Sequence, residues 1–224
     1  MKKGTAILST DAQKQLTARL GPIWDDPRDQ VALDEMIHGL EARYSLMRKI
    51  AVEPGVEDIL SQMLGRLARS FGSLSAVRGR RILDIACGSN TSKAPARFRI
   101  RTPFGHLLLG RPRSGYTALF EPWFCRILFH LGADAVGVDF GDLESEDFTH
   151  YRVDLGQPGA LDFLPDRSFD AIQDSRLFGS PEFTSQFPNQ SDRLSVAREI
   201  RRQEHRLLKT NGILIHSDAK ALLA

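Results

Sequence analysis

The stretch from Arg81 to Asn90, RILDIACGSN, decides the fold of this chain. It is a short apolar run that contains one acid, Asp84, and then breaks into small residues. Such a run is typical of a buried β-strand, and small residues at its end let the backbone approach a ligand closely. In open α/β sheets, ligands bind at the carboxyl ends of the strands. The stretch therefore predicts a sheet with a nucleotide-type site at this turn.

Beyond this strand, short β-type runs alternate with helical periodicity. Strand-like runs cover residues 135–140, 151–154, 169–173 and 212–217. Helical patterns cover residues 119–131, with Pro122 in the first turn and Gly132 at the end, and residues 194–208. This alternation predicts an α/β fold with an open, mainly parallel sheet and flanking helices.

The residues before Arg81 have a different pattern. Apolar residues recur at steps of three and four over residues 29–71, with a break at Pro54 and Gly55 and an end at Gly72. Two amphipathic helices are expected, which form an N-terminal helical cap over residues 1–78, ahead of a domain of residues 79–224. Between the first two strands, residues 90–115 are rich in proline and glycine. We expect no regular structure there, which is typical of a functional lid or a disordered loop.

Composition excludes several classes. The 30 basic and 28 acidic residues give a formal charge of +2, which does not by itself indicate a polyanionic partner. The two cysteines, Cys87 and Cys125, lie far apart, so a disulfide framework is not expected and a reducing, cytoplasmic setting is. No apolar run approaches the roughly 18 residues of a membrane span. No set of Cys and His residues has the spacing of a zinc site, so no metal is expected.

The ordered strand ends resemble those of class I S-adenosylmethionine-dependent methyltransferases. Leu83 to Asn90 is similar to the first motif of that family, and Val136 to Phe140 resembles its second strand, which ends in an acid. The third, fourth and fifth strands are similar to residues 151–155, 168–175 and 207–215. The resemblance covers about residues 80–218. It implies a Rossmann-like domain, S-adenosylmethionine as cofactor and methyl transfer as the reaction.

The resemblance also implies roles for individual residues. Asp84 would hold the amino-acid end of the cofactor, Asp139 both ribose hydroxyls, and Phe140 one face of the adenine. The acid of Asp154 and the backbone amide of Leu155 would contact the adenine edge. The expected cofactor-binding residues are Asp84, Ala86, Cys87, Gly88, Ser89, Asp139, Phe140, Asp154, Leu155 and Asp174. Structural roles are the alternatives: a turn cap for Asp84, a solvated strand end for Asp139, a core position for Phe140 and a helix start for Asp174.

No catalytic residue follows from the cofactor motif, because a sulfonium is already an activated methyl donor. Asp174 at the end of the fourth strand and His216 after the fifth, together with Asp218, are the candidates for a base. Ser175, Arg176 and Phe178 are candidates for lining the acceptor pocket. A small-molecule acceptor is preferred, because the helical cap would be able to close over it.

Two departures from the family pattern are evident. Asp139 lies 51 positions after Gly88, whereas comparable folds place the acid about 20 residues on, so residues 90–115 are an insertion. We also expect the sheet to be curtailed after the fifth strand, where the family adds two more. The N-terminal helices or a second copy of the chain, as a homodimer, would cover that edge.

The insertion and one helix are rich in basic residues. The insertion contains no acid, and its basic residues are Lys93, Arg97, Arg99, Arg101, Arg111 and Arg113, with Phe98, Phe104 and Tyr116 among or beside them. Contact with nucleic acid is one interpretation, through phosphates and stacked bases, and a solvated loop is the other. A second basic set, expected to face solvent, consists of Arg198, Arg201, Arg202, Arg206 and Lys209.

Two further functions share this fold. A nicotinamide-dependent (NAD(P)) oxidoreductase would use the same ribose-binding acid, but its three-glycine fingerprint is absent, because Ser89, Asn90 and Thr91 follow Gly88. A non-catalytic module that binds a nucleotide or nucleic acid is the remaining alternative.

Overall fold

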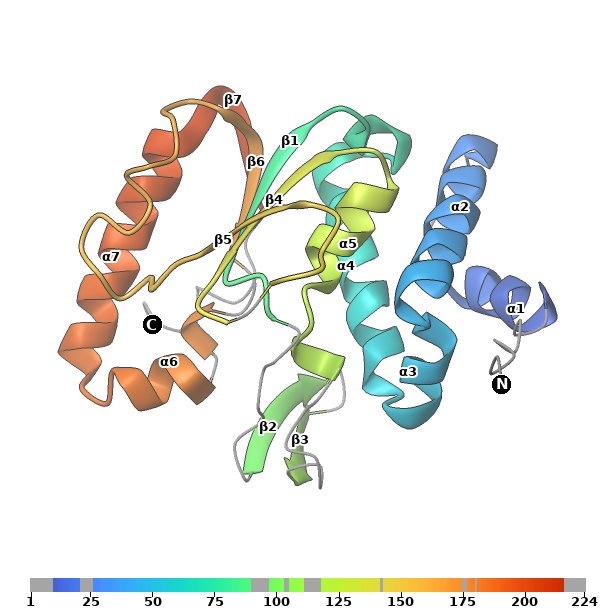
Figure 1. Cartoon of the computed structure of the whole chain (residues 1–224), viewed down its shortest axis with the longest axis horizontal. Helices are drawn as coiled ribbons and strands as arrows, with labels where there is room; N and C mark the ends of the chain where they lie inside the picture. Colours follow the sequence, from blue (N-terminus) through green and yellow to red (C-terminus); the bar gives the residue numbers. More distant parts are fainter. Residues whose placement is uncertain are drawn as a thin grey trace.

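The computed structural model describes residues 10–20, 26–89, 97–102, 105–110, 118–141, 143–174, 177–179 and 181–215. Its centre is a five-stranded sheet in the order β5-β4-β1-β6-β7, in which every adjacent pair is parallel. The strands are β1 (Arg81–Ile85), β4 (Asp134–Asp139), β5 (Thr149–Arg152), β6 (Phe169–Asp174) and β7 (Leu208–Ile215). The chain runs outward from β1 through β4 to β5 and then crosses to β6 and β7 (Figure 1). The predicted α/β, Rossmann-like fold is confirmed.

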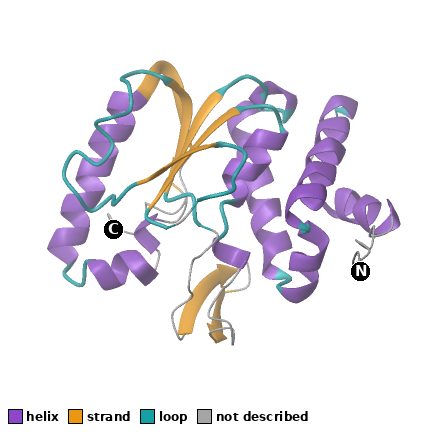
Figure 2. Ribbon diagram, viewed as in Figure 1, coloured by secondary structure: helices purple, strands orange, loops and turns teal. Residues whose placement is uncertain are grey.

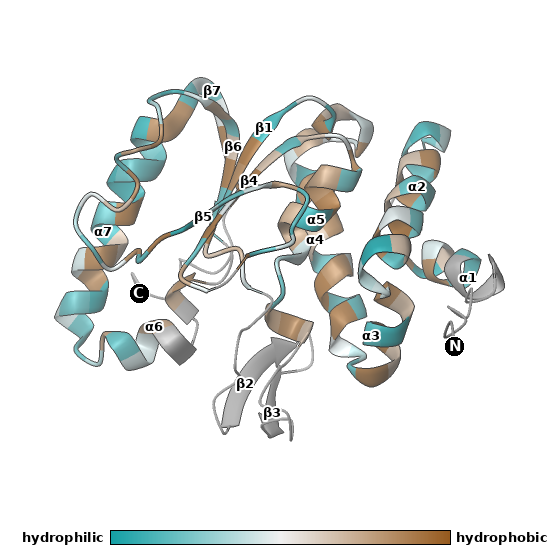
Figure 3. Ribbon diagram, viewed as in Figure 1, coloured by the Kyte–Doolittle hydropathy of each residue, from teal (hydrophilic) through white to brown (hydrophobic). Residues whose placement is uncertain are grey.

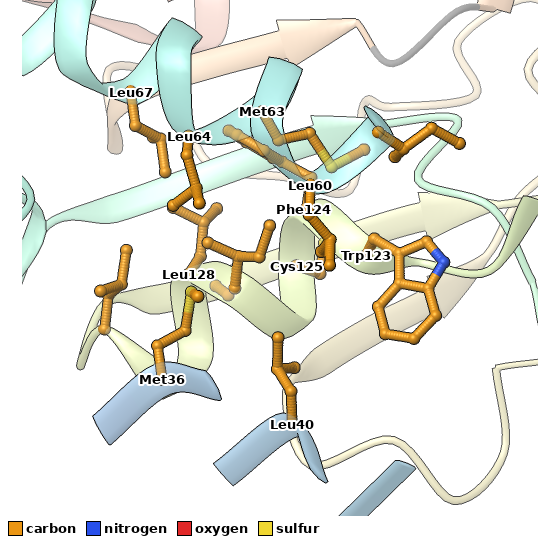
Figure 4. Close-up of a cluster of buried hydrophobic side chains, with 14 of the residues drawn as sticks. Met36, Leu40, Leu60, Met63, Leu64, Leu67, Trp123, Phe124, Cys125 and Leu128 are labelled. Atoms are coloured by element: carbon orange, nitrogen blue, oxygen red, sulfur yellow. The ribbon is translucent and has the colours of Figure 1, made fainter. Parts of the chain in front are cut away.

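One face of the sheet is covered by two layers of helices. Helices α4 (Gly55–Phe71) and α5 (Trp123–His130) lie nearest the strands, and α1 (Thr10–Leu20), α2 (Pro27–Tyr44) and α3 (Leu46–Val52) lie farther out (Figures 1 and 2). Side chains of α2, α4 and α5, such as Met36, Leu64 and Leu128, converge in the interior between these helices (Figure 4). The same buried cluster includes Ile82 and Ala171 of the sheet. The N-terminal helices therefore share one core with this face of the sheet.

The opposite face is covered by α7 (Gln190–Leu207), with α6 (Pro181–Gln186) before it. Leu83 and Ile85 of β1 pack there in a second cluster with Phe169 and Ile200, whereas Ile82 belongs to the first cluster. The hydropathy colouring follows this arrangement, with hydrophilic residues along α7 and hydrophobic ones in the strands and α5 (Figure 3). Because β1 is buried on both faces, its continuous apolar run has a physical reason.

The N-terminal helices are more divided than expected. Ser45 adopts a left-handed conformation with φ of 54°, which ends α2 and begins α3, and α1 lies before the predicted range. The predicted break before α4 is present, since Pro54 precedes its first residue, Gly55. The predicted helix over residues 119–131 starts later: a short 3-10 turn, η3 (Ala118–Phe120), precedes it and Pro122 is its N-cap. No helix among the described residues is long and apolar enough to span a bilayer.

The expectation of no regular structure over residues 90–115 was wrong for two segments. Strands β2 (Arg97–Thr102) and β3 (Gly105–Gly110) form an antiparallel hairpin, a sheet separate from the main one. The alternation of Phe98 and Ile100 with arginines, followed by Pro103 and Gly105 as turn residues, was the available signal. The rest of the insertion lies outside the described residues.

The end of α7 also differs from the expectation. Strand β7 begins at Leu208, directly after the helix, rather than at Gly212. Its pairing with β6 changes register between Phe169 and Ala171, which is where the extra residues are accommodated. Within the described residues the main sheet has five strands, with β5 and β7 at its edges.

Candidate functional site at the carboxyl ends of β1 and β4

The turn after β1 is held by backbone hydrogen bonds to strand β4 and to the 3-10 turn η3. The backbone N–H of Cys87 donates to Val138 of β4 at 3.1 Å, and that of Ser89 donates to the carbonyl of Phe120 at 3.0 Å. Gly88 has φ of 97°, and a Cβ there would lie 2.2 Å from the carbonyl oxygen of Phe120. Only glycine fits this position, because the backbone is left-handed and the neighbouring atom is main chain. Ala86 is also left-handed, with φ of 57°.

Asp139, at the end of β4, holds this turn through its side chain. Its Oδ2 accepts a hydrogen bond from the N–H of Gly88 at 3.0 Å, and its Oδ1 accepts one from Gly141 at 2.8 Å. Burial raises the pKa of Asp139, and the N–H groups of Gly141 and Gly88 act in the opposite direction. A carboxylate has about four acceptor sites, and the backbone N–H of Phe140 also interacts with this one, so part of its capacity remains for another donor. The structure thus brings together two predicted residues that lie 51 positions apart.

Asp84 lies beneath the turn, inside the sheet. Its side chain is fully buried, and the thiol of Cys125 on α5 contacts its Oδ2 at 3.8 Å. Cys87 and Cys125 are free, buried cysteines. Burial raises the pKa of the Cys125 thiol to about 11 and that of Cys87 well above its ordinary value, so both remain protonated at neutral pH. Asp84 is therefore an acid within a packed, buried layer that also contains Cys87 and Cys125.

The three predicted adenine contacts, Phe140, Asp154 and Leu155, follow the carboxyl ends of β4 and β5. Phe140 is 64% exposed, which excludes the alternative of a core position, and the Arg152 guanidinium carbon lies 5.8 Å from the centroid of its ring. Asp154 caps a turn, because its Oδ1 accepts from the N–H of Gly156 at 3.0 Å. The side-chain amide of Gln157 is the main cause of its lowered pKa. Leu155 packs against the second core cluster.

An open hollow runs beside these residues. It is lined by Leu143, Glu144, His150, Tyr151 and Arg152, from β5 and the segment before it. Arg152 connects the hollow to Phe140, since its Nε donates to the carbonyl of Phe140 at 3.1 Å. The hollow therefore adjoins the predicted adenine side of the site.

Asp174, at the end of β6, is held by a helix. It is buried, and its Oδ2 pairs with Arg201 of α7 at 3.0 Å. Arg201 also pairs with Glu204 at 2.6 Å. Burial raises the pKa of Glu204 to about 7, and the negative charge of Asp174 contributes. Asp174 thus belongs to a buried group of two acids and one arginine, which favours a positioning role over that of a free base.

This group corrects one expectation about α7. Arg201 was expected to face solvent, yet its side chain is only 22% exposed and it lies 5.8 Å from the ring of Phe178. Arg198 and Arg202 of the same set are exposed. Arg206 of the set is also partly buried, since its side chain is 21% exposed and its Nη2 donates to the carbonyl of Leu161 at 2.8 Å. The basic residues of this helix gave no signal that these two turn inward.

A second buried ion cluster was not expected from the sequence. Arg126 of α5 pairs with Glu146 at 2.6 Å and also with Glu121, which in turn pairs with Lys49 of α3. The hydroxyl of Tyr44 donates to Glu146 at 3.0 Å. Glu121 directly follows Phe120, the residue that accepts from Ser89, so this cluster fixes the segment that supports the turn. The one signal was an arginine within the apolar run of α5.

Several candidates lie outside the described residues: Ser175, Arg176, His216 and Asp218. Phe178, a candidate for the acceptor pocket, is buried and packs edge-on against Phe183 with centroids 5.5 Å apart. In the part of the chain that the structure describes, no group of three or more His, Cys, Asp or Glu side chains is arranged to hold a metal ion.

Comparisons with known proteins give a similarity to a solved structure. No protein-family model matches the chain, and no relative is found among curated proteins. The chain is similar to the trans-methyltransferase CalH, whose crystal structure is a complex with SAH, at 14% identity and a TM-score of 0.33. The match covers 91% of this chain and 51% of that one, so the chain spans about half the length of that protein.

Proposed function

We propose that this protein is an S-adenosylmethionine-dependent methyltransferase. The observation that carries the proposal is the pairing of Gly88 with Asp139 at the carboxyl ends of adjacent parallel strands. Here the glycine keeps the backbone open to a ligand, and the carboxylate has acceptor sites left for a ribose diol. The ordered motifs of residues 80–218 support the same proposal.

The surroundings of the turn favour this cofactor over a dinucleotide. A dinucleotide places its pyrophosphate on free backbone N–H groups at the start of a helix. Here the N–H groups of Gly88 and Ser89 already donate to Asp139 and to the carbonyl of Phe120. Among the described residues, the first α-helix after the turn begins at Trp123. S-adenosylmethionine carries no phosphate and needs no such helix start.

In this proposal the predicted residues at the strand ends would share the binding of the cofactor. Asp139 would accept from the ribose hydroxyls, and the exposed ring of Phe140 would cover one face of the adenine. Asp154 and Leu155, just after β5, would contact the adenine edge. Asp84, beneath the turn, would act on the amino-acid end through the turn or through water.

Methyl transfer requires little further chemistry from the protein. The cofactor supplies a methyl group that a sulfonium has already activated. The protein orients the donor and acceptor in line and excludes water, which accounts for large rate factors in such reactions. Asp174, held by Arg201, would orient groups near the transferred methyl rather than take a proton from the acceptor.

Calorimetric titration of the purified chain with S-adenosylmethionine, S-adenosylhomocysteine and NADH tests the proposal. We expect binding of the first two, and at least a tenfold loss of their affinity in Asp139→Asn, since about 1.4 kcal/mol corresponds to tenfold. Asp58→Asn changes an exposed acid on α4 and is the matched control. Thermal unfolding of both variants verifies that they fold. Tight binding of NADH alone, or equal affinity in Asp139→Asn and the wild type, would contradict the proposal.

A further inference from the structure

The insertion concentrates the positive charge of the chain. No acid occurs between Asp84 and Glu121, and six basic residues do. The remainder of the chain has 24 basic against 28 acidic residues. The overall charge of +2 therefore combines one cationic segment with a remainder that has more acidic than basic residues.

The register of the hairpin sorts this segment into two faces. Alternate residues of a strand lie on the same face, so positions 97, 99 and 101 of β2, all arginine, share one face of the ribbon. Arg101 is opposite His106, which adds to that face. Phe98 is opposite Leu109 and Ile100 is opposite Leu107, on the other face. By register, one face, called the cationic face, has the three arginine positions and His106 together with Leu108 and Gly110, and the other has the apolar positions 98, 100, 107 and 109.

The hairpin stands at the mouth of the proposed site. In the sequence it lies between the turn at Gly88 and Ser89 and η3, where Phe120 accepts from Ser89. Figure 1 shows β2 and β3 extending beyond the carboxyl edge of the main sheet. An acceptor that is bound along the hairpin would therefore lie next to the methyl donor.

The three arginine positions form a regular row. Residues two apart in a strand are separated by about 6.6 Å, which is close to the interval between successive phosphates of an extended nucleic-acid strand. Arginine binds phosphate through two parallel hydrogen bonds, which makes it well suited to such a row. We infer that the cationic face of the hairpin binds the phosphodiester backbone of single-stranded nucleic acid and that this strand is the methyl acceptor. The second part rests on the proposed methyltransferase function.

Two observations refine this inference. Position 98 is on the face opposite the arginine positions, so no aromatic position of β2 lies within the row, and we expect binding to depend little on base sequence. The preference for a small-molecule acceptor depended on a cap that closes over the site. Helices α1 to α4 form layers on one face of the sheet (Figure 2), and the small-molecule acceptor stays a prediction beside the one inferred from the hairpin.

Binding of fluorescently labelled 20-nucleotide RNA and DNA strands, and of a duplex, tests the inference. The variant Arg97→Gln/Arg99→Gln/Arg101→Gln removes three charges from the row. At 0.1 M salt we expect about a 100-fold loss of affinity for single strands, and a salt slope lower by about 2, since each lost contact contributes about 0.7. A matched control, Arg48→Gln/Arg69→Gln/Arg198→Gln, removes three exposed charges from α3, α4 and α7. It should change affinity little, because charges beyond about 10 Å are screened.

The outcomes separate the two proposals. Equal losses in the row variant and the control, or no binding of any strand by the wild type, would overturn the hairpin inference while leaving titration with S-adenosylmethionine to decide the methyltransferase. If the wild type binds single strands, the row variant loses that affinity, and S-adenosylmethionine does not bind, only the methyltransferase proposal would be overturned. Preference for the duplex would overturn the single-strand claim. Transfer of a labelled methyl group to the bound strand is the expected result, and its absence in protein that binds both would overturn the acceptor claim. Circular dichroism and thermal unfolding verify the fold of each variant.

Discussion

Asp139 and Asp174 end the two strands on either side of β1, and they are held in different ways. Asp139 accepts backbone N–H groups of Gly88 and Gly141, both within the turns that follow their strands. Asp174 is held by Arg201, a side chain from helix α7 on the far side of a crossover. The carboxylate near β4 is fixed by main chain, and the one near β6 by a buried ion group.

This difference separates their chemical uses. A carboxylate that is fixed by the main chain is positioned whatever the surrounding side chains are, and it retains acceptor sites for a ligand. A carboxylate in a buried ion group depends on the charge of its partners. The carboxylate of Asp139 is therefore suited to accepting hydrogen bonds from a ligand. The carboxylate of Asp174 instead connects the end of β6 to helix α7.

Loss of the arginine that serves both acids should have the largest effect on stability. Arg201→Met leaves Asp174 and Glu204 buried without their shared cation, and such losses cost about 3–5 kcal/mol. Urea unfolding measures the free energy. Arg198→Met changes an exposed arginine one turn earlier in α7 and should alter it by less than about 0.5 kcal/mol. Similar free energies for the two variants would mean that the ion group contributes nothing to holding the β6 side.

A substitution of Gly88 tests the turn whose backbone N–H holds Asp139. Gly88→Ala combines left-handed backbone strain with a Cβ 2.2 Å from a carbonyl oxygen, and we expect a loss of about 2–5 kcal/mol. Gly72→Ala has a similar φ of 77° but no heavy atom within 4 Å of the Cβ, so it should lose only about 1–2 kcal/mol. The difference between the two isolates the close approach at the turn. If urea unfolding gave equal losses of unfolding free energy for the two variants, the backbone around Gly88 would be able to move away from the added Cβ.

The pH dependence of stability should sharpen the comparison further. Burial raises the pKa of Glu204 to about 7, from 4.5 in the unfolded chain. Between these values the folded protein binds more protons, so the free energy of unfolding falls as pH rises from 4.5 to 7, by up to about 3 kcal/mol. Glu204→Gln should remove this fall.

Glu199 provides a control for the pH experiment, because its pKa is lowered in the folded protein whereas that of Glu204 is raised. The Arg202 side chain lowers the pKa of Glu199 to about 2, so its contribution is lost only as pH falls below about 4.5. Glu199→Gln should leave the profile between pH 5 and 8 unchanged. Urea unfolding at several pH values measures all three proteins, and a fall that persists in Glu204→Gln would assign it to another group.

The features that were predictable from the sequence are local ones. The apolar run of β1, the acid that ends β4 and the glycine turn each have a short pattern, and together they gave the parallel sheet. Their contacts with S-adenosylmethionine stay predictions. The hairpin was missed because proline and glycine in its surroundings outweighed the alternation of Phe98 and Ile100.

The features that were missed at the site depend on distant partners. Arg126 meets Glu146 and Tyr44, and Arg201 meets Asp174, across gaps in sequence that no periodicity records. The left-handed Ser45 that separates α2 from α3 has neither glycine nor proline beside it as a signal. Sequence patterns thus locate the strand ends, and the packed helices determine which charges surround them.

The hydrogen bond from Ser89 to Phe120 has a consequence for how such a protein can vary. It joins the two ends of the insertion at one point on the body of the molecule. A segment whose ends already meet can be lengthened, shortened or exchanged at a small cost in loop entropy. We therefore expect that insertions of other lengths or sequences at this point would leave the sheet and the turn in place.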